Sequence, residues 1–178
     1  MDIRKLFSLE GRVALVTGAT HGLGMAVATA LAGAGATLAV NGHSADRLDK
    51  ALKTYENKGI DAKGYLFDVT DEQAVAEGVA RIEREAGPID ILVNNAGIIK
   101  RIPALEMTLP EWNEVIATDL TSPFLMSRAV AAGMIRRGHG KIVNMCSMMS
   151  EVGRSSVTAY AAAKGGLKML TKNLATEW

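Results

Sequence analysis

Apolar runs rich in β-branched residues alternate with segments of helical spacing along the chain. Five of the runs predict β-strands, at residues 12–18, 36–42, 62–69, 89–97 and 140–147. Four helix-like segments lie between them, at residues 22–36, 45–59, 71–87 and 109–138, and the first three have apolar residues at helical spacing. Several strands are almost continuously apolar, as strands buried on both faces are. The alternation predicts an α/β fold, a doubly wound parallel sheet of about five strands with helices on both faces.

The last segment, residues 158–178, predicts a long amphipathic helix with Leu167, Leu170 and Leu174 at helical spacing. No repeat, low-complexity stretch or linker interrupts the pattern. At 178 residues the chain has the length of one domain with a substantial core. We therefore expect residues 1–178 to form a single domain.

Composition narrows the possible partners. The chain is 48% apolar and 22% charged, which favours a globular protein over a disordered one. Twenty basic residues balance nineteen acidic ones, so we expect neither nucleic acid nor a membrane surface as the main partner. The first residues hold no apolar stretch typical of a signal peptide or membrane span, which predicts a soluble, cytoplasmic protein.

The cysteine and histidine content points to neither a disulfide framework nor a metal site. Cys146 is the single cysteine, which suits a reducing compartment, and we expect it to be a small buried apolar residue. The three histidines are scattered and share no spacing typical of metal ligands, so no metal is expected.

A glycine-rich turn, "TGATHGLG", follows the first predicted strand. Glycines at 18, 22 and 24 let the backbone turn tightly and approach a pyrophosphate at the start of the next helix. The same turn could be an ordinary strand–turn–helix junction. Its place in the first βα unit favours a Rossmann-type dinucleotide-binding domain with strand order 3-2-1-4-5, in which the cofactor also meets Thr20, His21 and Leu23.

The ends of the second and third strands bear on the choice of cofactor. The second strand ends in "VNGHS" with no carboxylate to hold a ribose 2′-hydroxyl, and His43 or Arg47 could approach a 2′-phosphate, so NADP is favoured over NAD. These positions could also be plain turn residues. After the third strand, Asp68, followed by Val69, could accept a hydrogen bond from an adenine amino group or cap the helix that starts near Asp71.

Two further loops are expected at the same edge of the sheet. In "NNAG", after the fourth strand, Asn95 can stabilise the loop while Ala96 and Gly97 leave room for a flat ligand; alone, the segment could be a simple turn. Ser147 ends the fifth strand and would reach the same crevice, although serine there is also a common turn former.

The segment "AYAAAKGG" places Tyr160 and Lys164 one helical turn apart, and we expect the alanines between them to leave a low surface against which a large ligand can lie. They could be an ordinary exposed pair on a helix rich in alanine. A phenol is a poor base at neutral pH unless a nearby cation stabilises its anion, and Lys164 would supply that cation. With Ser147, the pair suits proton exchange with a hydroxyl or carbonyl while a nicotinamide carries the hydride.

The combination of TGxxxGxG, NNAG and Ser147…Tyr160-x-x-x-Lys164 resembles the short-chain dehydrogenase/reductase family from about residue 9 onward. The resemblance implies that Tyr160 is the general acid/base and that Ser147 orients the substrate. It implies that Lys164 binds the nicotinamide ribose and makes the tyrosine more acidic. It further implies NADP or NAD as cofactor and a homo-oligomer, a dimer or tetramer.

Within that family, residues 94–107 and 146–173 are similar to gluconate 5-dehydrogenases, which interconvert gluconate and 5-ketogluconate. The resemblance implies a sugar-acid substrate whose carboxylate meets Arg101 and Arg154, with Met149 on the pocket wall. The arginines could equally be surface residues, and the methionine core filler. The alternatives are a 3-oxoacyl-carrier-protein reductase, which shares the Ser–Tyr–Lys set, and a non-catalytic nucleotide-binding fragment.

Two features depart from the family pattern. Asp119 stands where many members have an asparagine that serves a proton relay, and an ionised carboxylate accepts hydrogen bonds but cannot donate them. A relay role for Asp119 is the expectation. The chain also lacks the further strands and substrate-covering loop that family members usually carry after the Tyr-bearing helix. It therefore resembles the cofactor half of such an enzyme together with its catalytic helix, C-terminally truncated.

Overall fold

The computed structural model describes residues 6–178, and these form a five-stranded parallel sheet between two layers of helices. The strands are β1 (Val13–Val16), β2 (Thr37–Gly42), β3 (Ala62–Leu66), β4 (Ile89–Asn94) and β5 (Lys141–Asn144). All neighbours pair in parallel, in the order β3-β2-β1-β4-β5. Fold class, strand count and strand order are confirmed.

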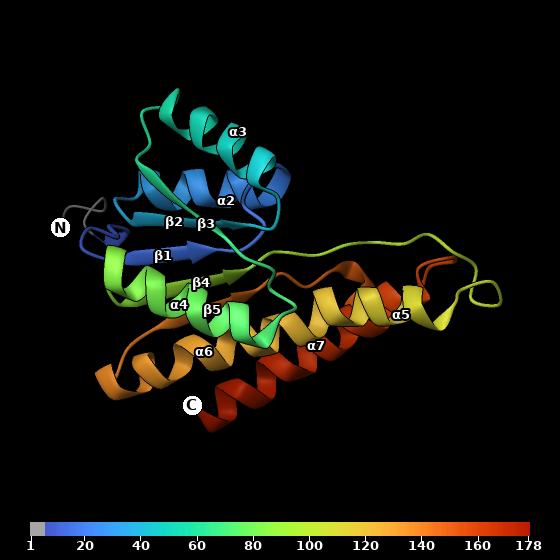
Figure 1. Ribbon diagram of the computed structural model, residues 1–178. Helices are drawn as coiled ribbons and strands as arrows, with labels where there is room; N and C mark the ends of the chain where they lie inside the picture. Colours follow the sequence, from blue (N-terminus) through green and yellow to red (C-terminus); the bar gives the residue numbers. More distant parts are fainter. Residues whose placement is uncertain (1–5) are drawn as a thin grey trace.

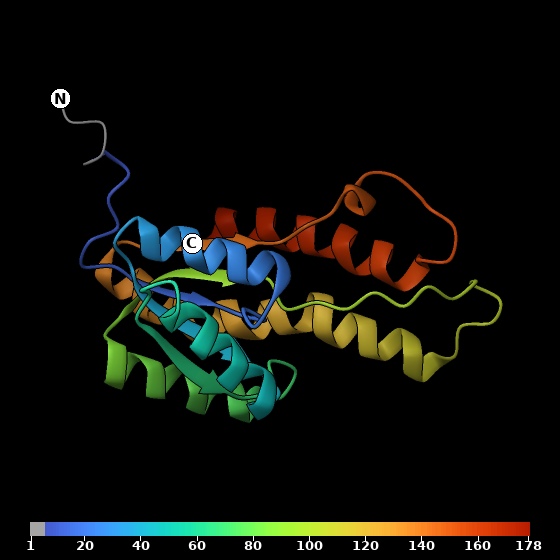
Figure 2. The same ribbon diagram turned by 90° about the horizontal axis from the view of Figure 1, so that it is seen from above.

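The helices divide between the two faces of the sheet. They are α2 (Gly22–Gly33), α3 (Ala45–Glu56), α4 (Glu72–Ala86), α5 (Leu109–Ile116), α6 (Ser122–Arg137) and α7 (Thr158–Glu177), with a π-helical turn η1 (Ala117–Thr121) and a 3₁₀ turn η2 (Met148–Ser150). Figure 1 shows α2 and α3 on one face and α4, α6 and α7 on the other, and Figure 2 shows the same layers from above. The right-handed crossover of each β–helix–β unit requires this division, because the strand order reverses direction after β3.

Two apolar layers stabilise the sheet. On one side, Leu15 and Leu92 of the strands pack against Ile82 of α4 and Met126 of α6. On the other side, residues such as Val40 pack against α2 and α3. Each large side chain removed from water in this way contributes roughly 1.5–3 kcal/mol of transfer free energy.

The expectation that strands are buried on both faces holds for the centre of the sheet only. β1 is buried along its whole length, whereas β3 and β5 alternate between covered and exposed positions. These two strands lie at the edges of the sheet, where only one neighbouring strand and part of a helix layer cover them. The prediction from their sequences therefore overestimated how far the side chains of these two strands are buried.

Side-chain caps fix where two of the helices begin. Asp71 caps α4, because its carboxylate accepts a hydrogen bond from the Ala74 amide at 3.0 Å. The alternative that Asp68 caps this helix is wrong: its Oδ1 accepts instead from the Thr70 amide and hydroxyl, at 2.8 Å each. Thr108 and Glu111 form a reciprocal capping box at the start of α5.

The predicted helix over residues 109–138 forms as α5, η1 and α6 in continuous succession. The π-helical turn in its middle adds a residue to the local repeat, and Asp119 within it is fully buried. Such single π turns often occur at functional sites. No apolar periodicity could have predicted this turn, since it occurs inside an otherwise regular helical pattern.

The C-terminal helix α7 forms as predicted, but two of its alanines have another role than expected. Ala159 and Ala163 are fully buried and pack against Val115 of α5. Their small side chains allow two helices to approach, so they do not leave an open surface for a ligand. Of the alanines in "AYAAAKGG", Ala161 is partly exposed to solvent and Ala162 is exposed.

Candidate active site

A cleft of about 500 Å³ opens at the carboxyl ends of the central strands. The loop after β1 contributes residues 18 and 20–24, and the other walls come from the loops after β2, β3 and β4 and from one side of α5 and η1. Twelve residues predicted to bind the cofactor line it: Gly18, Thr20, His21, Gly22, Leu23, Gly24, His43, Asp68, Val69, Asn95, Ala96 and Gly97. Ligands of doubly wound sheets bind at this edge.

The glycine turn and the "NNAG" loop are packed too closely for larger residues. A Cβ on Gly18, whose φ is +61°, would lie 2.9 Å from the Ala96 Cα. A Cβ on Gly24 would lie 2.4 Å from the Asn95 Nδ2. Asn95 in turn donates from Nδ2 to the carbonyls of Thr17 and Gly18, at 2.9 and 3.1 Å. Glycine is required at both positions, which keeps the floor of the cleft flat.

Thr17, at the end of β1, was missed by the sequence reasoning. Its hydroxyl oxygen accepts hydrogen bonds from the amides of Asn95 and Ala96, both at 3.0 Å. It thereby joins the two loops that form the cleft. The only sequence signal was its position directly before Gly18. Glu114 and Thr118 also line the cleft and were missed; their i, i+4 spacing on one helix face was the available signal.

The residues around the cleft fit the phosphates of a dinucleotide. His21 occupies the N-cap of α2 with extended backbone and makes no capping side-chain bond to the first turn, which contains no acidic residue. The first amides of α2 therefore face the cleft with the positive end of the helix dipole. A Cβ on Gly22 would meet nothing within 4 Å, so the space beside this turn is open.

The end of β2 presents no carboxylate to this cleft. Asn41 is buried and donates from Nδ2 to the carbonyls of Tyr65 and Phe67, at 3.3 and 3.0 Å, so its amide ties β2 to β3. His43 and Arg47 line the cleft beyond it. A ribose phosphate would meet a cation there, and the end of β2 itself supplies no repelling carboxylate.

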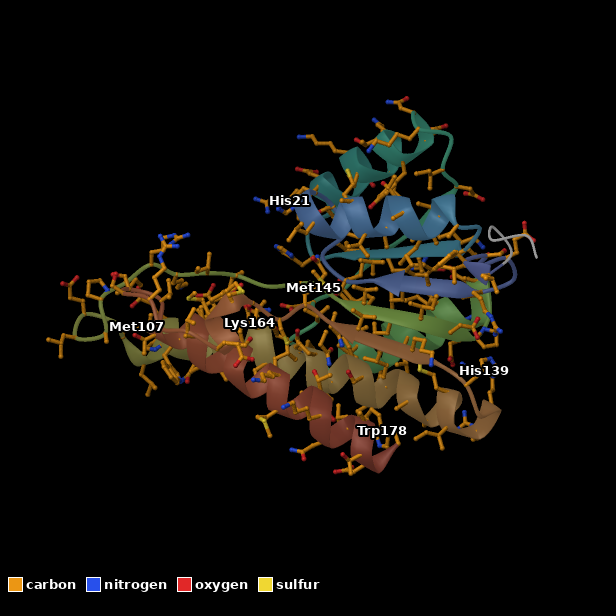
Figure 3. The ribbon with its side chains drawn as sticks, turned by 180° about the vertical axis from the view of Figure 1, so that it is seen from behind. His21, Met107, His139, Met145, Lys164 and Trp178 are labelled. Atoms are coloured by element: carbon orange, nitrogen blue, oxygen red, sulfur yellow. The ribbon has the colours of Figure 1, made fainter. Side chains whose placement is uncertain are left out.

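Lys164 is buried beside Tyr160 and is held on two sides. Its Nζ donates to the Met145 carbonyl at 2.9 Å and lies 3.1 Å from Asp119 Oδ2 as an ion pair. The same Nζ is 5.6 Å from the centre of the Tyr160 ring, within the range of a cation–π contact. Figure 3 shows Lys164, Met145 and His21 at the same end of the sheet, with His139 at the opposite end. Neither Tyr160 nor Lys164 lines the cleft itself.

Asp119 links the cleft to this pair. Its Oδ1 accepts a hydrogen bond from the Ile98 amide at 2.7 Å, and a Cβ on Gly97 would lie 2.8 Å from its Oδ2. Burial raises the pKa of Asp119 above its usual value, while Lys164 and the Ile98 amide act in the opposite direction. The loop of residues 96–98 therefore has the cleft on one side and the Asp119–Lys164 ion pair on the other.

Ser147 lies three residues beyond the end of β5 and caps the 3₁₀ turn η2. Its Oγ accepts from the Met149 amide at 3.2 Å. The prediction that Cys146 is buried is wrong, because the thiol is exposed. The strand alternation on which that prediction rested ends at Asn144, the last residue of β5.

The predicted substrate residues lie outside the cleft. Arg101 and Arg154 are exposed, and they belong to two loops that the backbone bond from the Ile102 amide to the Ser156 carbonyl joins at 2.9 Å. Met149 is half-buried in η2. The structure thus brings the two arginine-bearing loops together, beside one another.

The residues from 6 to 178 include no helix that is both long and apolar enough to cross a membrane. Among these same residues, no three His, Cys, Asp or Glu side chains gather as metal ligands would.

The doubly wound sheet with a glycine-lined cleft at its carboxyl edge defines the class of Rossmann-like α/β proteins. Residues 12–178 match the short chain dehydrogenase family, and the chain belongs to that family, as its resemblance implied. It is similar to two curated relatives. One is the 2-dehydro-3-deoxy-D-gluconate 5-dehydrogenase of Formosa agariphila, 59% identical over 97% of this chain and 66% of the relative. The other is the gluconate 5-dehydrogenase of Gluconobacter oxydans, 49% identical over 97% of this chain and 68% of the relative.

A solved structure supports the same placement within the family. The gluconate 5-dehydrogenase from Burkholderia cenocepacia, in complex with NADP and tartrate, superimposes with a TM-score of 0.93 at 38% identity. The match covers 99% of this chain and 69% of that structure. The chain therefore spans about two thirds of the length of the relatives it matches.

Proposed function

We propose that the protein is an NAD(P)-dependent oxidoreductase that interconverts a hydroxyl and a ketone of a sugar acid. The first candidate pair of substrate and product is gluconate and 5-ketogluconate. The observation that carries the proposal is the buried Lys164 ammonium beside Tyr160, one loop away from a cleft lined by twelve predicted cofactor residues. The similarity to two sugar-acid dehydrogenases supports the substrate class.

NADP is the proposed cofactor, with NAD as the second choice. The amides at the start of α2 and the glycine turn would hold its pyrophosphate, and the loop of Asn95, Ala96 and Gly97 would border the nicotinamide side. His43 and Arg47 would meet the 2′-phosphate, because the end of β2 offers no carboxylate. The related structure solved with NADP supports this choice.

The chemistry divides between the cofactor and the side chains of the chain. A bound oxidised nicotinamide would supply the acceptor for the hydride that leaves the substrate carbon. Tyr160, as its anion, takes the proton from the substrate hydroxyl, and in the reverse direction it returns the proton to the ketone oxygen. Lys164 stabilises the anion of Tyr160, and the Ser147 hydroxyl holds the substrate oxygen in place.

Asp119 is proposed to keep Lys164 in position for this step. The carboxylate lies 3.1 Å from the ammonium and is itself fixed by the Ile98 amide. Because an ionised carboxylate donates no hydrogen bond, a relay through Asp119 requires its protonated form or its acceptor oxygen alone.

The substrate carboxylate is proposed to bind Arg101 and Arg154, whose loops adjoin one another. Two guanidinium groups on neighbouring loops can each donate hydrogen bonds to one carboxylate. Met149 would form part of the pocket wall. Gluconate and 2-dehydro-3-deoxygluconate share this carboxylate and the C5 hydroxyl. The second of these is the other candidate substrate, because the relative named for it has the higher identity, 59% against 49%.

The test compares turnover with four substrates: gluconate, 2-dehydro-3-deoxygluconate, gluconamide and a 3-oxoacyl thioester. The proposal expects turnover with at least one of the two acids, a KM for gluconamide at least about tenfold higher, and a similar loss in Arg101→Ala and Arg154→Ala. Preference for the thioester would identify a 3-oxoacyl-carrier-protein reductase. NADPH binding without turnover of any substrate would identify a non-catalytic nucleotide-binding protein.

A further inference from the structure

The serine at position 150 connects two parts of the candidate site that are distant in sequence. Its hydroxyl donates to the Lys164 carbonyl at 2.9 Å and accepts from the Ser147 amide at 3.3 Å. Ser147 caps η2 and Lys164 lies in α7, and the exposed loop of residues 151–155 separates the two elements along the chain. One hydroxyl therefore uses its donor and its acceptor to join both elements.

The connection lies at the part of α7 that matters for the proposed chemistry. Lys164 is held at its side chain by the Met145 carbonyl and at its own carbonyl by Ser150. Tyr160 lies one helical turn before it on the same face. Contacts at Lys164 thus help to set the position of α7 relative to the Ser147 turn.

A second contact between the same elements is too exposed to replace this one. Glu151 forms an ion pair with Lys168 one turn further along α7, but 58% of the glutamate side chain is exposed. Exposed ion pairs of this kind contribute about 0–1 kcal/mol. The half-buried hydroxyl of Ser150, by contrast, bonds directly to Ser147 and Lys164.

We propose that Ser150 is a positioning residue that fixes the Ser147 hydroxyl relative to Tyr160 and Lys164, an inference that rests on the proposed function. The substrate oxygen must meet Ser147 and Tyr160 together, and small misplacements of reacting groups cost large factors in rate. Removal of the Ser150 hydroxyl leaves the Ser147 amide and the Lys164 carbonyl without this partner and frees η2 to shift along α7.

The experiment compares Ser150→Ala, Ser150→Thr and Ser155→Ala. Ser155 is the matched control, because it is an exposed serine in the loop that follows η2. Its hydroxyl makes no hydrogen bond within residues 6–178. We expect Ser150→Ala to lower kcat about 10- to 100-fold with KM for the sugar acid and Kd for NADPH within about twofold of wild type. Ser150→Thr keeps a hydroxyl and restores most of kcat, and Ser155→Ala leaves kcat unchanged.

Amide hydrogen exchange provides a second readout that needs no turnover. Ser150→Ala should speed exchange at the Ser147 amide by about tenfold, the loss of one net hydrogen bond, while Ser150→Thr and Ser155→Ala should not. If wild type turns over no sugar acid, the proposed function fails, and the exchange measurement still decides whether Ser150 fixes the turn. A kcat in Ser150→Ala within about twofold of an active wild type, or unchanged exchange at Ser147, overturns the inference.

Discussion

The buried ion pair between Asp119 and Lys164 gives the most quantitative prediction. Asp119 is completely buried and the Lys164 side chain is 5% exposed, with 3.1 Å between Oδ2 and Nζ. At an effective dielectric constant near 20 the attraction between the two charges is ~5 kcal/mol. Burial opposes it, and this is why the pKa of Asp119 remains raised despite the neighbouring ammonium.

The perturbation is the set Asp119→Leu, Lys164→Met and the double variant. Asp119→Leu leaves an ammonium in the interior with only the Met145 carbonyl as partner, so we expect a loss of roughly 3–5 kcal/mol in the free energy of unfolding. Lys164→Met should cost less, roughly 2–4 kcal/mol, because the remaining carboxyl can take up a proton.

The double variant distinguishes a coupled pair from two independent residues. Leucine and methionine remove both charges and fill a similar volume, so the double variant should lie within about 2 kcal/mol of wild type. The coupling free energy should then be at least about 3 kcal/mol. Urea unfolding followed by circular dichroism measures all four proteins, and the corresponding loss in Tm for Asp119→Leu is roughly 10 °C. Additive losses in the double variant would refute the reasoning.

The same pair has a defined pH dependence. Because the pKa of Asp119 in the folded state is raised above the 3.8 of an unperturbed aspartate, its contribution to stability is full below pH 3.8 and is lost as the pH rises through the folded pKa. Wild type should therefore lose stability relative to Asp119→Asn as the pH rises from acid to neutral. A difference between the two proteins that grows in the opposite direction would contradict the burial of this carboxylate.

Three further predictions follow from the cleft and the core. Gly24→Ala should raise the Kd for NADPH about tenfold or more, because its Cβ would lie 2.4 Å from the Asn95 amide, whereas Gly33→Ala in the same helix meets no atom within 4 Å and should leave binding unchanged. Arg47→Ala should weaken NADPH more than NADH, by about tenfold in the ratio of Kd values, and equal losses would contradict a 2′-phosphate site. Tyr55→Phe should cost about 1–3 kcal/mol at neutral pH, because the Tyr55 hydroxyl donates to the Ala19 carbonyl at 2.8 Å. Burial raises the pKa of Tyr55 to about 12. In urea unfolding experiments this difference should therefore be full below 10.0, the pKa of an unperturbed tyrosine, and vanish as the pH rises through about 12.

The sequence predicted the sheet and the residues that line the cleft because both rest on local patterns. The central strand β1 is a continuous apolar run, β4 is apolar except at Asp90 and Asn94, and the carboxyl ends of both must lie at one edge of a parallel sheet. The glycine turn after β1 and the Asn95 loop after β4 therefore lie side by side, whatever the path of the later part of the chain. Spacing alone was sufficient for these features.

Other features depend on tertiary contacts that no spacing shows. The π turn that buries Asp119 against Lys164 occurs within a regular helical pattern, and the exposure of Cys146 depends on where β5 ends. Thr17 and Ser150 act through hydroxyls that bond to distant backbone groups, and such bonds leave no periodic signal. The alanines of α7 were predicted to face a ligand, whereas Ala163 faces α5.

Tyr160 is proposed to exchange a proton with a sugar-acid hydroxyl beside a bound nicotinamide. The most direct measurement is NADPH formation from NADP⁺ and gluconate, followed by absorbance, for wild type and Tyr160→Phe, which removes only the phenolic oxygen. We predict steady turnover in wild type, a loss of at least about 10³-fold in kcat for the variant, and an equal Kd for NADPH in both proteins. Turnover in Tyr160→Phe within about tenfold of wild type would contradict the account.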